Sequence, residues 1–157
     1  MDKSTNQPKP TIMAVASIGG HWIQLLRITK GLSADFNVTY SSTDPKCASM
    51  VDGADFFAVK DFSRWNAYLI VPNFFRFLGR FVMQRPAAVI TTGAAPGLTA
   101  LLAARLLGIR TVWVDSIANV EHLSFSGRVA RKFAGRTYTQ WEELKDNRTV
   151  YAGNVLG

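Results

Sequence analysis

The sequence predicts an α/β fold in which a mostly parallel sheet is covered by helices on both faces. Short apolar stretches of strand-like composition alternate along the chain with longer segments of helical periodicity. Several of these stretches, such as residues 11–17, 55–59 and 87–91, contain continuous apolar runs, which is typical of parallel strands buried on both faces. Small or ionisable residues follow three of these stretches, at the places where such sheets bind ligands.

Strands and helices are expected in alternation from residue 11 to the end of the chain. Strands are expected over residues 11–17, 36–41, 55–59, 87–91, 110–115, 136–139 and 149–151. Helices are expected over residues 21–32, 45–51, 72–84, 97–107 and 124–133. Pro96 near the start of the fourth helix and Gly108 just past its end are the usual punctuation of a helix.

The composition indicates one globular domain, residues 11–157, preceded by a flexible polar tail, residues 1–10. Of 157 residues, 48% are hydrophobic and 18% charged, which excludes wholesale disorder. The tail has no apolar signal-peptide core, and no apolar run approaches the roughly 18 residues needed to cross a bilayer. The single cysteine, Cys47, cannot form an internal disulfide, and no Cys/His spacing suits zinc. No metal and no cofactor are predicted.

The positive charge narrows the choice of partners. A net charge of +7 suits nucleic acid, an anionic membrane surface or a phosphorylated substrate. No zinc-finger spacing, RNP-type aromatic motif or basic zipper is present, so no nucleic-acid partner is predicted. The cations gather in two clusters, Arg76, Arg80 and Arg85 in a phenylalanine-rich segment and Arg128, Arg131, Lys132 and Arg136 further on.

The turns that follow the first, fourth and fifth strands are candidate phosphate sites. They read "SIGGH", "TTGAAPG" and "VDS", and no glycine turn matches GxGxxG or GxxxxGK[ST]. A dinucleotide fingerprint and a P-loop are therefore unsupported, but helix N-termini with free N–H groups can still hold phosphate. Tight strand–helix packing would explain the glycines equally well. The predicted acceptor- or phosphate-binding residues are Gly19, Gly20, Thr92, Gly93, Gly97, Ser116, Ser124 and Ser126.

Three motifs resemble one family of enzymes. "GGH", "TTGAAPG" and "VDSIANVEHLSFSGRVARKFAGRTYTQWEELKDNRTVYAGNVLG" look like the acceptor-side subunit of split, two-chain glycosyltransferases. The resemblance covers nearly the whole chain after residue 11, and the last block is its most specific part. The family includes the membrane-anchoring partner of the eukaryotic dolichol-pathway N-acetylglucosaminyltransferase. It also includes bacterial exopolysaccharide subunits that pair with a separate donor-binding chain.

The resemblance implies a GT-B architecture in which this chain is the N-terminal, Rossmann-like, acceptor-binding half. A separate donor-binding glycosyltransferase subunit would complete the active site. The pair would transfer a sugar from a nucleotide-sugar, expected to be a UDP-sugar, to a lipid-linked saccharide in polysaccharide or lipid-linked oligosaccharide biosynthesis. The polar tail differs from the membrane anchor of eukaryotic members. We therefore expect a bacterial-type member, bound peripherally at the cytoplasmic face of the cell membrane.

Three residues are candidates for the catalytic base. An inverting sugar transfer needs a base to take the proton of the acceptor hydroxyl. His21, Asp115 and Glu121 could fill this role, and the sequence does not rank them. Each also has a structural explanation: a solvated turn residue, a cap of a backbone N–H and a surface ion pair, respectively. The turn that contains His21 is similar to the glycine-glycine-histidine turn of the related one-chain transferase of peptidoglycan synthesis. In that enzyme the turn faces the lipid diphosphate acceptor.

Residues 73–85 are the candidate membrane-binding segment. On a helix, Asn73, Arg76, Arg80 and Gln84 form one narrow polar stripe, and large apolar residues occupy the remaining circumference. Such a helix suits an anionic membrane interface, although a crossover helix buried by a neighbouring segment would show the same pattern. The residues expected to contact the membrane are Phe74, Phe75, Arg76, Phe77, Arg80 and Phe81.

The segment after the sixth strand is the candidate partner interface. An aromatic residue beside charges, here Trp141 and Glu142, suits a protein–protein interface, although burial of Trp141 within the chain is an equal explanation. Two other functions stay open. One is a non-catalytic Rossmann-like binding module for a nucleotide or a phosphorylated metabolite, and the other is a nucleic-acid-binding or scaffold protein that uses the positive charge.

Overall fold

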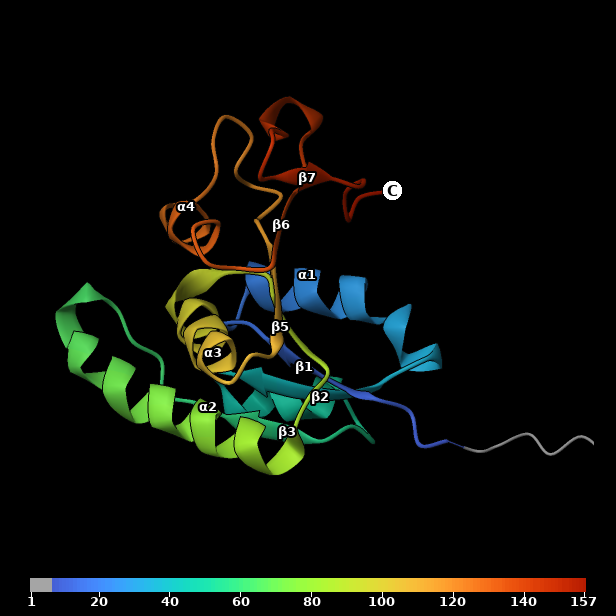
Figure 1. The fold of residues 1–157 in the computed structure, drawn as a ribbon, viewed down its shortest axis with the longest axis vertical. Helices are drawn as coiled ribbons and strands as arrows, with labels where there is room; N and C mark the ends of the chain where they lie inside the picture. Colours follow the sequence, from blue (N-terminus) through green and yellow to red (C-terminus); the bar gives the residue numbers. More distant parts are fainter. Residues whose placement is uncertain (1–6) are drawn as a thin grey trace, which may run out of the picture.

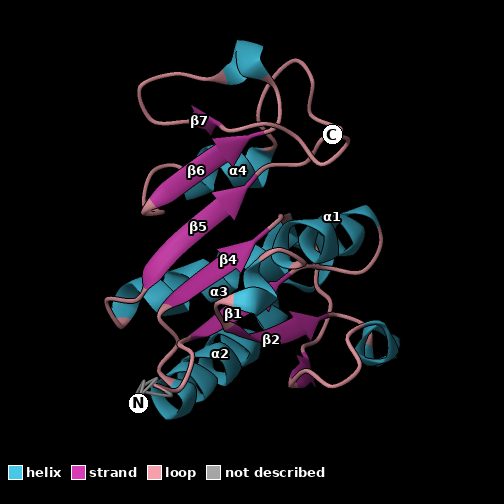
Figure 2. Cartoon of the chain, turned by 90° about the vertical axis from the view of Figure 1, so that its right-hand side faces the viewer, coloured by secondary structure: helices cyan, strands magenta, loops and turns pink. Residues whose placement is uncertain are grey.

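The structure, a computed structural model, describes residues 7–157. Residues 1–6, most of the predicted flexible tail, lie outside the described residues. Seven strands of the described chain form one sheet in the order β3-β2-β1-β4-β5-β6-β7, with every neighbouring pair parallel (Figures 1 and 2). The strands are β1 (Thr11–Val15), β2 (Asn37–Ser42), β3 (Phe56–Ala58), β4 (Ala88–Thr91), β5 (Arg110–Val114), β6 (Arg136–Thr139) and β7 (Val150–Tyr151). The predicted parallel sheet is confirmed.

The helices differ from the prediction mainly at their ends. The α-helices are α1 (Gly20–Thr29), α2 (Ile70–Gln84), α3 (Ala94–Leu106) and α4 (Phe125–Ala130). Short 3₁₀ helices cover Leu32–Ala34, Pro45–Met50, Arg64–Leu69 and Glu142–Leu144. The α-helix expected over residues 45–51 is thus a 3₁₀ helix, whose first turn is capped by the Asp44 carboxylate accepting from the Lys46 N–H at 2.8 Å.

The helices cover both faces of the sheet, as predicted. α1 lies on one face, and α2, α3 and α4 lie on the other (Figures 1 and 2). Successive residues of a strand point to opposite faces, so β1 contributes to two cores. Met13 and Val15 join the core under α2, α3 and α4, whereas Ile12 and Ala14 join the core under α1.

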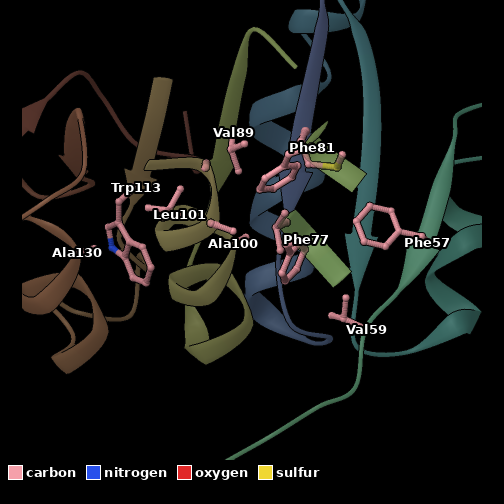
Figure 3. Packing of buried hydrophobic residues seen from close by; sticks show 13 residues of the cluster. Phe57, Val59, Phe77, Phe81, Val89, Ala100, Leu101, Trp113 and Ala130 are labelled. Atoms are coloured by element: carbon pink, nitrogen blue, oxygen red, sulfur yellow. The ribbon is translucent and has the colours of Figure 1, made fainter. Parts of the chain in front are cut away.

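α3 is the central helix of the layer that it shares with α2 and α4. It packs against both neighbours and buries most of its circumference, which explains why it is apolar on nearly all sides. Figure 3 shows Leu101 of this helix beside Trp113 of β5, with Phe77 and Phe81 of α2 further along the same core. This packing fixes the N-terminus of α3 at the carboxyl edge of the sheet.

Three residues of the polar stripe predicted on α2, Asn73, Arg80 and Gln84, bind partners within the protein, whereas Arg76 is exposed. Asn73 is 2% exposed, and its amide donates to the Lys60 carbonyl at 2.7 Å and accepts from the Lys60 N–H at 3.2 Å. Arg80 pairs with Asp55 at 3.0 Å, and Gln84 donates to the same carboxylate at 2.7 Å. Polar partners in the segments that flank β3 therefore hold these three side chains against the protein.

The phenylalanines expected to contact a membrane are divided between core and surface. Phe77 and Phe81 are 0% and 1% exposed, and Phe74 packs partly buried against the same core. The predicted membrane contact by Phe77 and Phe81 is wrong, because these rings fill the space between α2 and the sheet. Phe75 is 62% exposed, and Arg76 beside it is also exposed.

Exposed apolar side chains continue from Phe75 along the outer side of α2 and the preceding 3₁₀ helix. Spacings of four and seven residues place Val71, Phe75 and Val82 on one side of the helix. We call this surface the outer face of α2; it comprises Trp65, Tyr68, Val71, Phe75, Val82 and Met83. Between residues 7 and 157 the structure contains no helix with the length and apolarity that a membrane span requires.

Candidate functional site

The carboxyl ends of β1, β4 and β5 meet at one edge of the sheet, because these strands are parallel neighbours. The segments that follow them carry His21, Thr92 with Gly93, and Asp115 with Ser116. The structure therefore places three groups of predicted site residues at the edge where open α/β sheets bind their ligands.

His21 is held by the turn that follows β4. Its Nδ1 lies 2.9 Å from the Thr92 carbonyl oxygen, and the Thr92 hydroxyl donates to the His21 carbonyl at 2.6 Å. Because a carbonyl can only accept, Nδ1 of the half-buried ring carries the proton in this contact. The other ring nitrogen, Nε2, is then the proton acceptor of the neutral imidazole. This is the tautomer that a general base requires.

Gly93 makes room for the imidazole. Its φ of 132° is a conformation that favours glycine, and a Cβ at this position would lie 2.8 Å from His21 Cε1 and 2.9 Å from Nδ1. Gly19, with a φ of 96°, is required for its backbone conformation alone, because nothing lies within 4 Å of where its Cβ would be. The space beside Gly19, in the turn between β1 and α1, is therefore open.

His21 lies in the first turn of α1, beside the N-terminus of α3. α1 begins after Gly19 and α3 begins after Gly93, and no side chain in the described range caps either of them. α4 differs, because the Ser124 hydroxyl caps it by accepting from the Gly127 N–H at 2.9 Å. The first-turn N–H groups of α1, and those of Ala94 and Ala95 in α3, where Pro96 has none, are thus available to an anion such as phosphate.

Asp115 is a structural carboxylate in this arrangement. It is 1% exposed and accepts four hydrogen bonds, at 2.6–3.1 Å, which leaves no free lone-pair direction for a substrate proton. Its donors are Trp113 Nε1, Asn119 Nδ2, the Ser124 N–H and the Ser124 hydroxyl. These bonds fix the loop between β5 and α4.

Two buried glutamines, which the sequence did not identify, join this loop to α1 and to the end of the chain. Gln24 donates to the Ser116 hydroxyl at 3.2 Å and accepts from the Ile117 N–H at 3.1 Å. Gln140 donates to Gln24 and to the Asp115 carbonyl, and it accepts from the Val155 N–H at 3.0 Å. Ser116 is thus part of a closed internal network. The only signal in the sequence was a polar residue among the buried positions of α1.

The remaining predicted residues are placed as follows. A Cβ on Gly97 would overlap the Thr91 hydroxyl, so this glycine serves strand–helix packing. Ser126 is half-buried in the first turn of α4. Glu121 is exposed in the loop after β5, and its side chain makes no hydrogen bond or ion pair with residues 7–157. Glu121 is therefore free to act on a ligand.

The predicted interface residues, Trp141 and Glu142, lie near the loop between β5 and α4. Trp141 is half-buried, and its Nε1 donates to the Ile117 carbonyl at 2.8 Å. Glu142 is exposed and pairs with Lys145 at 2.7 Å; this hydrogen bond and charge hold the pKa of the Glu142 carboxyl below its ordinary value. These contacts do not test the predicted interface, which stays a prediction.

The edge of the sheet therefore combines a proton acceptor with two helix N-termini that no side chain in the described range caps. His21 Nε2 can take a proton from a hydroxyl, and the first turns of α1 and α3 can hold a phosphate group of the same ligand. Among the described residues, no cluster of three or more Cys, His, Asp or Glu could hold a metal ion. The geometry fits a hydroxyl-bearing, phosphorylated ligand.

Solved structures with the same fold are about twice as long as this chain. MurG of Acinetobacter baumannii superposes with a TM-score of 0.78 at 19% identity, over 94% of this chain and 46% of MurG. UDP-N-acetylglucosamine 2-epimerase of Rickettsia bellii superposes with a TM-score of 0.72 at 13% identity, over 94% of this chain and 46% of the epimerase. The predicted fold, a Rossmann-like half of a GT-B architecture, is confirmed.

Sequence comparisons identify the family of the chain. Over 80 residues the chain is 32% identical to the UDP-N-acetylglucosamine transferase subunit ALG14 of Mus musculus. This alignment covers 46% of this chain and 37% of the mouse protein. Residues 76–155, half of the chain, match the family described as "Oligosaccharide biosynthesis protein Alg14 like". This chain is therefore a member of the Alg14-like family of oligosaccharide biosynthesis proteins.

Proposed function

We propose that this chain is the acceptor-binding subunit of a two-chain glycosyltransferase, which transfers a sugar from a UDP-sugar to a lipid-linked saccharide. The observation that carries the proposal is the His21 imidazole, held by Thr92 in the uncapped first turn of α1, beside the uncapped N-terminus of α3. Membership of the Alg14-like family and the mouse transferase subunit support lipid-linked oligosaccharide synthesis. The exopolysaccharide pathway and a bacterial membrane have no such support and stay predictions.

His21 is the proposed general base. Its Nε2 takes the proton of the acceptor hydroxyl while the hydroxyl oxygen forms a bond to the anomeric carbon of the donor sugar, and the nucleotide diphosphate leaves. The N–H groups at the starts of α1 and α3 hold the phosphate that links the acceptor saccharide to its lipid. Glu121 is the remaining alternative for the base, because the Asp115 carboxylate is fully occupied.

The donor-binding half is proposed to be a separate polypeptide. The mouse relative is named a transferase subunit, which supports a partner chain. An apolar groove of about 650 Å³ supports this proposal. It lies on the α1 face of the sheet, between α1 and residues 152–157, with Ile90, Val112 and Val114 among its lining residues. Parallel sheets are normally covered on both faces, so this groove suits a segment of the partner chain.

The outer face of α2 is proposed to rest on the membrane that carries the acceptor. Its exposed aromatic and aliphatic side chains would enter the interface, and Arg76 at its border would attract anionic lipid. Arg80 is removed from this role, because it pairs with Asp55 and lies 4.8 Å from the centre of the Phe57 ring. The protein is thus proposed to bind the membrane peripherally, at its cytoplasmic face.

The membrane proposal predicts that a double variant, Val71→Asp with Phe75→Asp, loses binding to anionic vesicles. Burying one such side chain contributes about 1.5–3 kcal/mol, so we expect vesicle binding to fall by at least about tenfold. Both side chains are exposed, so the far-ultraviolet circular dichroism and the unfolding midpoint should not change. The measurement is co-sedimentation with vesicles that contain anionic phospholipid.

Ile23→Asp is the matched control, because Ile23 is exposed on α1 across the sheet from α2. It should bind vesicles as the wild-type chain does. Equal binding by the folded double variant, or equal loss in the control, would contradict membrane contact by the outer face of α2.

The experiment that tests the proposed function is a transfer assay with UDP-sugars and lipid-linked acceptors. It compares this chain, the donor-binding chain and the mixture of both. Transfer is expected in the mixture, because the base and the donor site then lie on facing halves of one cleft.

A further inference from the structure

A second polar site lies away from the strand ends, beside α4. A cleft of about 500 Å³ separates this helix from the turn that precedes β7. Its lining residues are Arg128, Arg131, Lys132, Asn147 and Arg148. All but one of these side chains carry a positive charge, and neither the proposed catalysis nor the proposed acceptor site uses any of them.

The fold brings these charges together from two segments. Arg128 lies in α4, and Arg131 and Lys132 follow directly after the helix; all three side chains line the cleft. Arg148 comes from the turn before β7, and Asp146 ties this turn to the helix by pairing with Arg131 at 2.7 Å. The arrangement is therefore fixed by contacts within the chain.

Asp146 is committed to holding the turn. One carboxylate oxygen accepts from the Arg148 and Thr149 N–H groups, each at 2.8 Å, and the other accepts from Arg131. The Arg148 N–H, together with the Arg131 guanidinium and the Thr149 N–H, holds the pKa of this carboxyl below its ordinary value. The carboxylate therefore stays ionised at neutral pH and neutralises one of the four cations.

Three positive charges are left in excess in this small cleft. Arg128, Lys132 and Arg148 form no ion pair with any other residue between 7 and 157. These three side chains line the same cleft, and like charges held close together repel each other, so they destabilise the unliganded arrangement. An anion in the cleft would relieve this repulsion.

The chemistry of the lining selects the kind of anion. Guanidinium groups bind phosphate oxygens in a bidentate manner, a lysine adds a point charge, and the Asn147 amide can donate a further hydrogen bond. The lining contains no aromatic ring on which a nucleobase could stack. We propose that this cleft is a binding site for a phosphate group, separate from the acceptor site at the strand ends.

Two sources could present such a group. One is the headgroup of an anionic phospholipid, because α4 lies on the same face of the sheet as α2, whose outer face is proposed to contact the membrane (Figures 1 and 2). The other is a soluble phosphorylated compound. Both sources present a phosphate group to the cleft, and sedimentation with vesicles distinguishes them.

The test uses the full chain and a double variant, Arg128→Gln with Lys132→Gln, which leaves the Arg131–Asp146 pair intact. The control variant, Arg110→Gln with Arg136→Gln, removes two exposed arginines at the starts of β5 and β6 and lowers the net charge equally. Binding of inorganic pyrophosphate is measured by calorimetry, with circular dichroism as the folding control. The cleft variant should bind at least about tenfold more weakly, since charge-assisted hydrogen bonds are the strong ones, and the control should stay within about twofold.

Sedimentation with phosphatidylcholine vesicles, with and without phosphatidic acid, identifies the source. A larger loss of binding to phosphatidic acid in the cleft variant than in the control assigns a lipid headgroup; equal vesicle binding, with pyrophosphate binding lost, assigns a soluble phosphate. No saturable pyrophosphate binding by the wild-type chain, or equal weakening in both variants, would overturn the proposal. The proposal would also be overturned if the wild-type chain bound an oligonucleotide but not pyrophosphate, and the cleft variant lost this oligonucleotide binding.

Discussion

Replacing His21 with alanine is expected to lower sugar transfer by the assembled enzyme by about 100-fold or more. A positioned general base contributes on the order of 10²–10⁴ to a rate, and the Thr92 carbonyl fixes the ring in the tautomer that this role needs. The stability of the fold should change little, since His21 is half-buried and loses one hydrogen bond, worth about 1 kcal/mol. The measurement is the rate of transfer with the partner chain present, beside urea unfolding of this chain.

His21→Asn is the matched control for this prediction. The asparagine amide can still donate to the Thr92 carbonyl, but the side chain has no basic nitrogen. We therefore expect near wild-type stability with the same loss of transfer. Transfer within a few-fold of wild type in both variants would return His21 to a role in turn structure and leave Glu121 as the candidate base.

Replacing Asp115 with alanine is expected to have the largest effect on stability. The change leaves four donors without their acceptor, from Trp113, Asn119 and Ser124. Each buried donor left unsatisfied costs about 1–3 kcal/mol, so the free energy of unfolding should fall by about 4 kcal/mol or more. This is a large part of the 5–15 kcal/mol that is typical of a domain.

Asp115→Asn separates this structural role from a chemical one. The amide keeps the shape and one acceptor oxygen, so the free energy of unfolding should fall by roughly half as much as in the alanine variant. Urea unfolding of both variants is the measurement. A loss below about 1 kcal/mol in the alanine variant, with transfer abolished in the asparagine variant, would contradict the structural assignment and make Asp115 a catalytic residue.

The sheet could be predicted from the sequence because each strand is signalled locally. The apolar runs place β6 at its observed bounds and the other strands within one or two residues. The glycine turns likewise located His21 and Gly93 at the edge of the sheet. The 3₁₀ helix Arg64–Leu69 was missed, because a turn capped by Ser63 has no long hydrophobic period to reveal it.

The orientation of α2 could not be predicted, because distant partners decide it. The helix carries both an apolar side and a polar stripe, and either could face water. Asp55 and the backbone of Lys60 bind Arg80 and Asn73 and so hold these two side chains against the protein, while Arg76 stays exposed. Nothing near residues 70–84 in the sequence signals these contacts, and the role of Asp115 was hidden for the same reason.

The central claim is that this chain provides the acceptor half of an enzyme completed by another polypeptide. The most direct measurement is the transfer of sugar from radiolabelled UDP-sugar to a lipid-linked acceptor by each purified chain alone and by the two mixed. We expect no transfer by either chain alone, transfer by the mixture, and loss of that transfer when this chain carries His21→Ala. Sustained transfer by this chain alone, free of the partner, would contradict the claim, and so would full activity of the donor-binding chain without it.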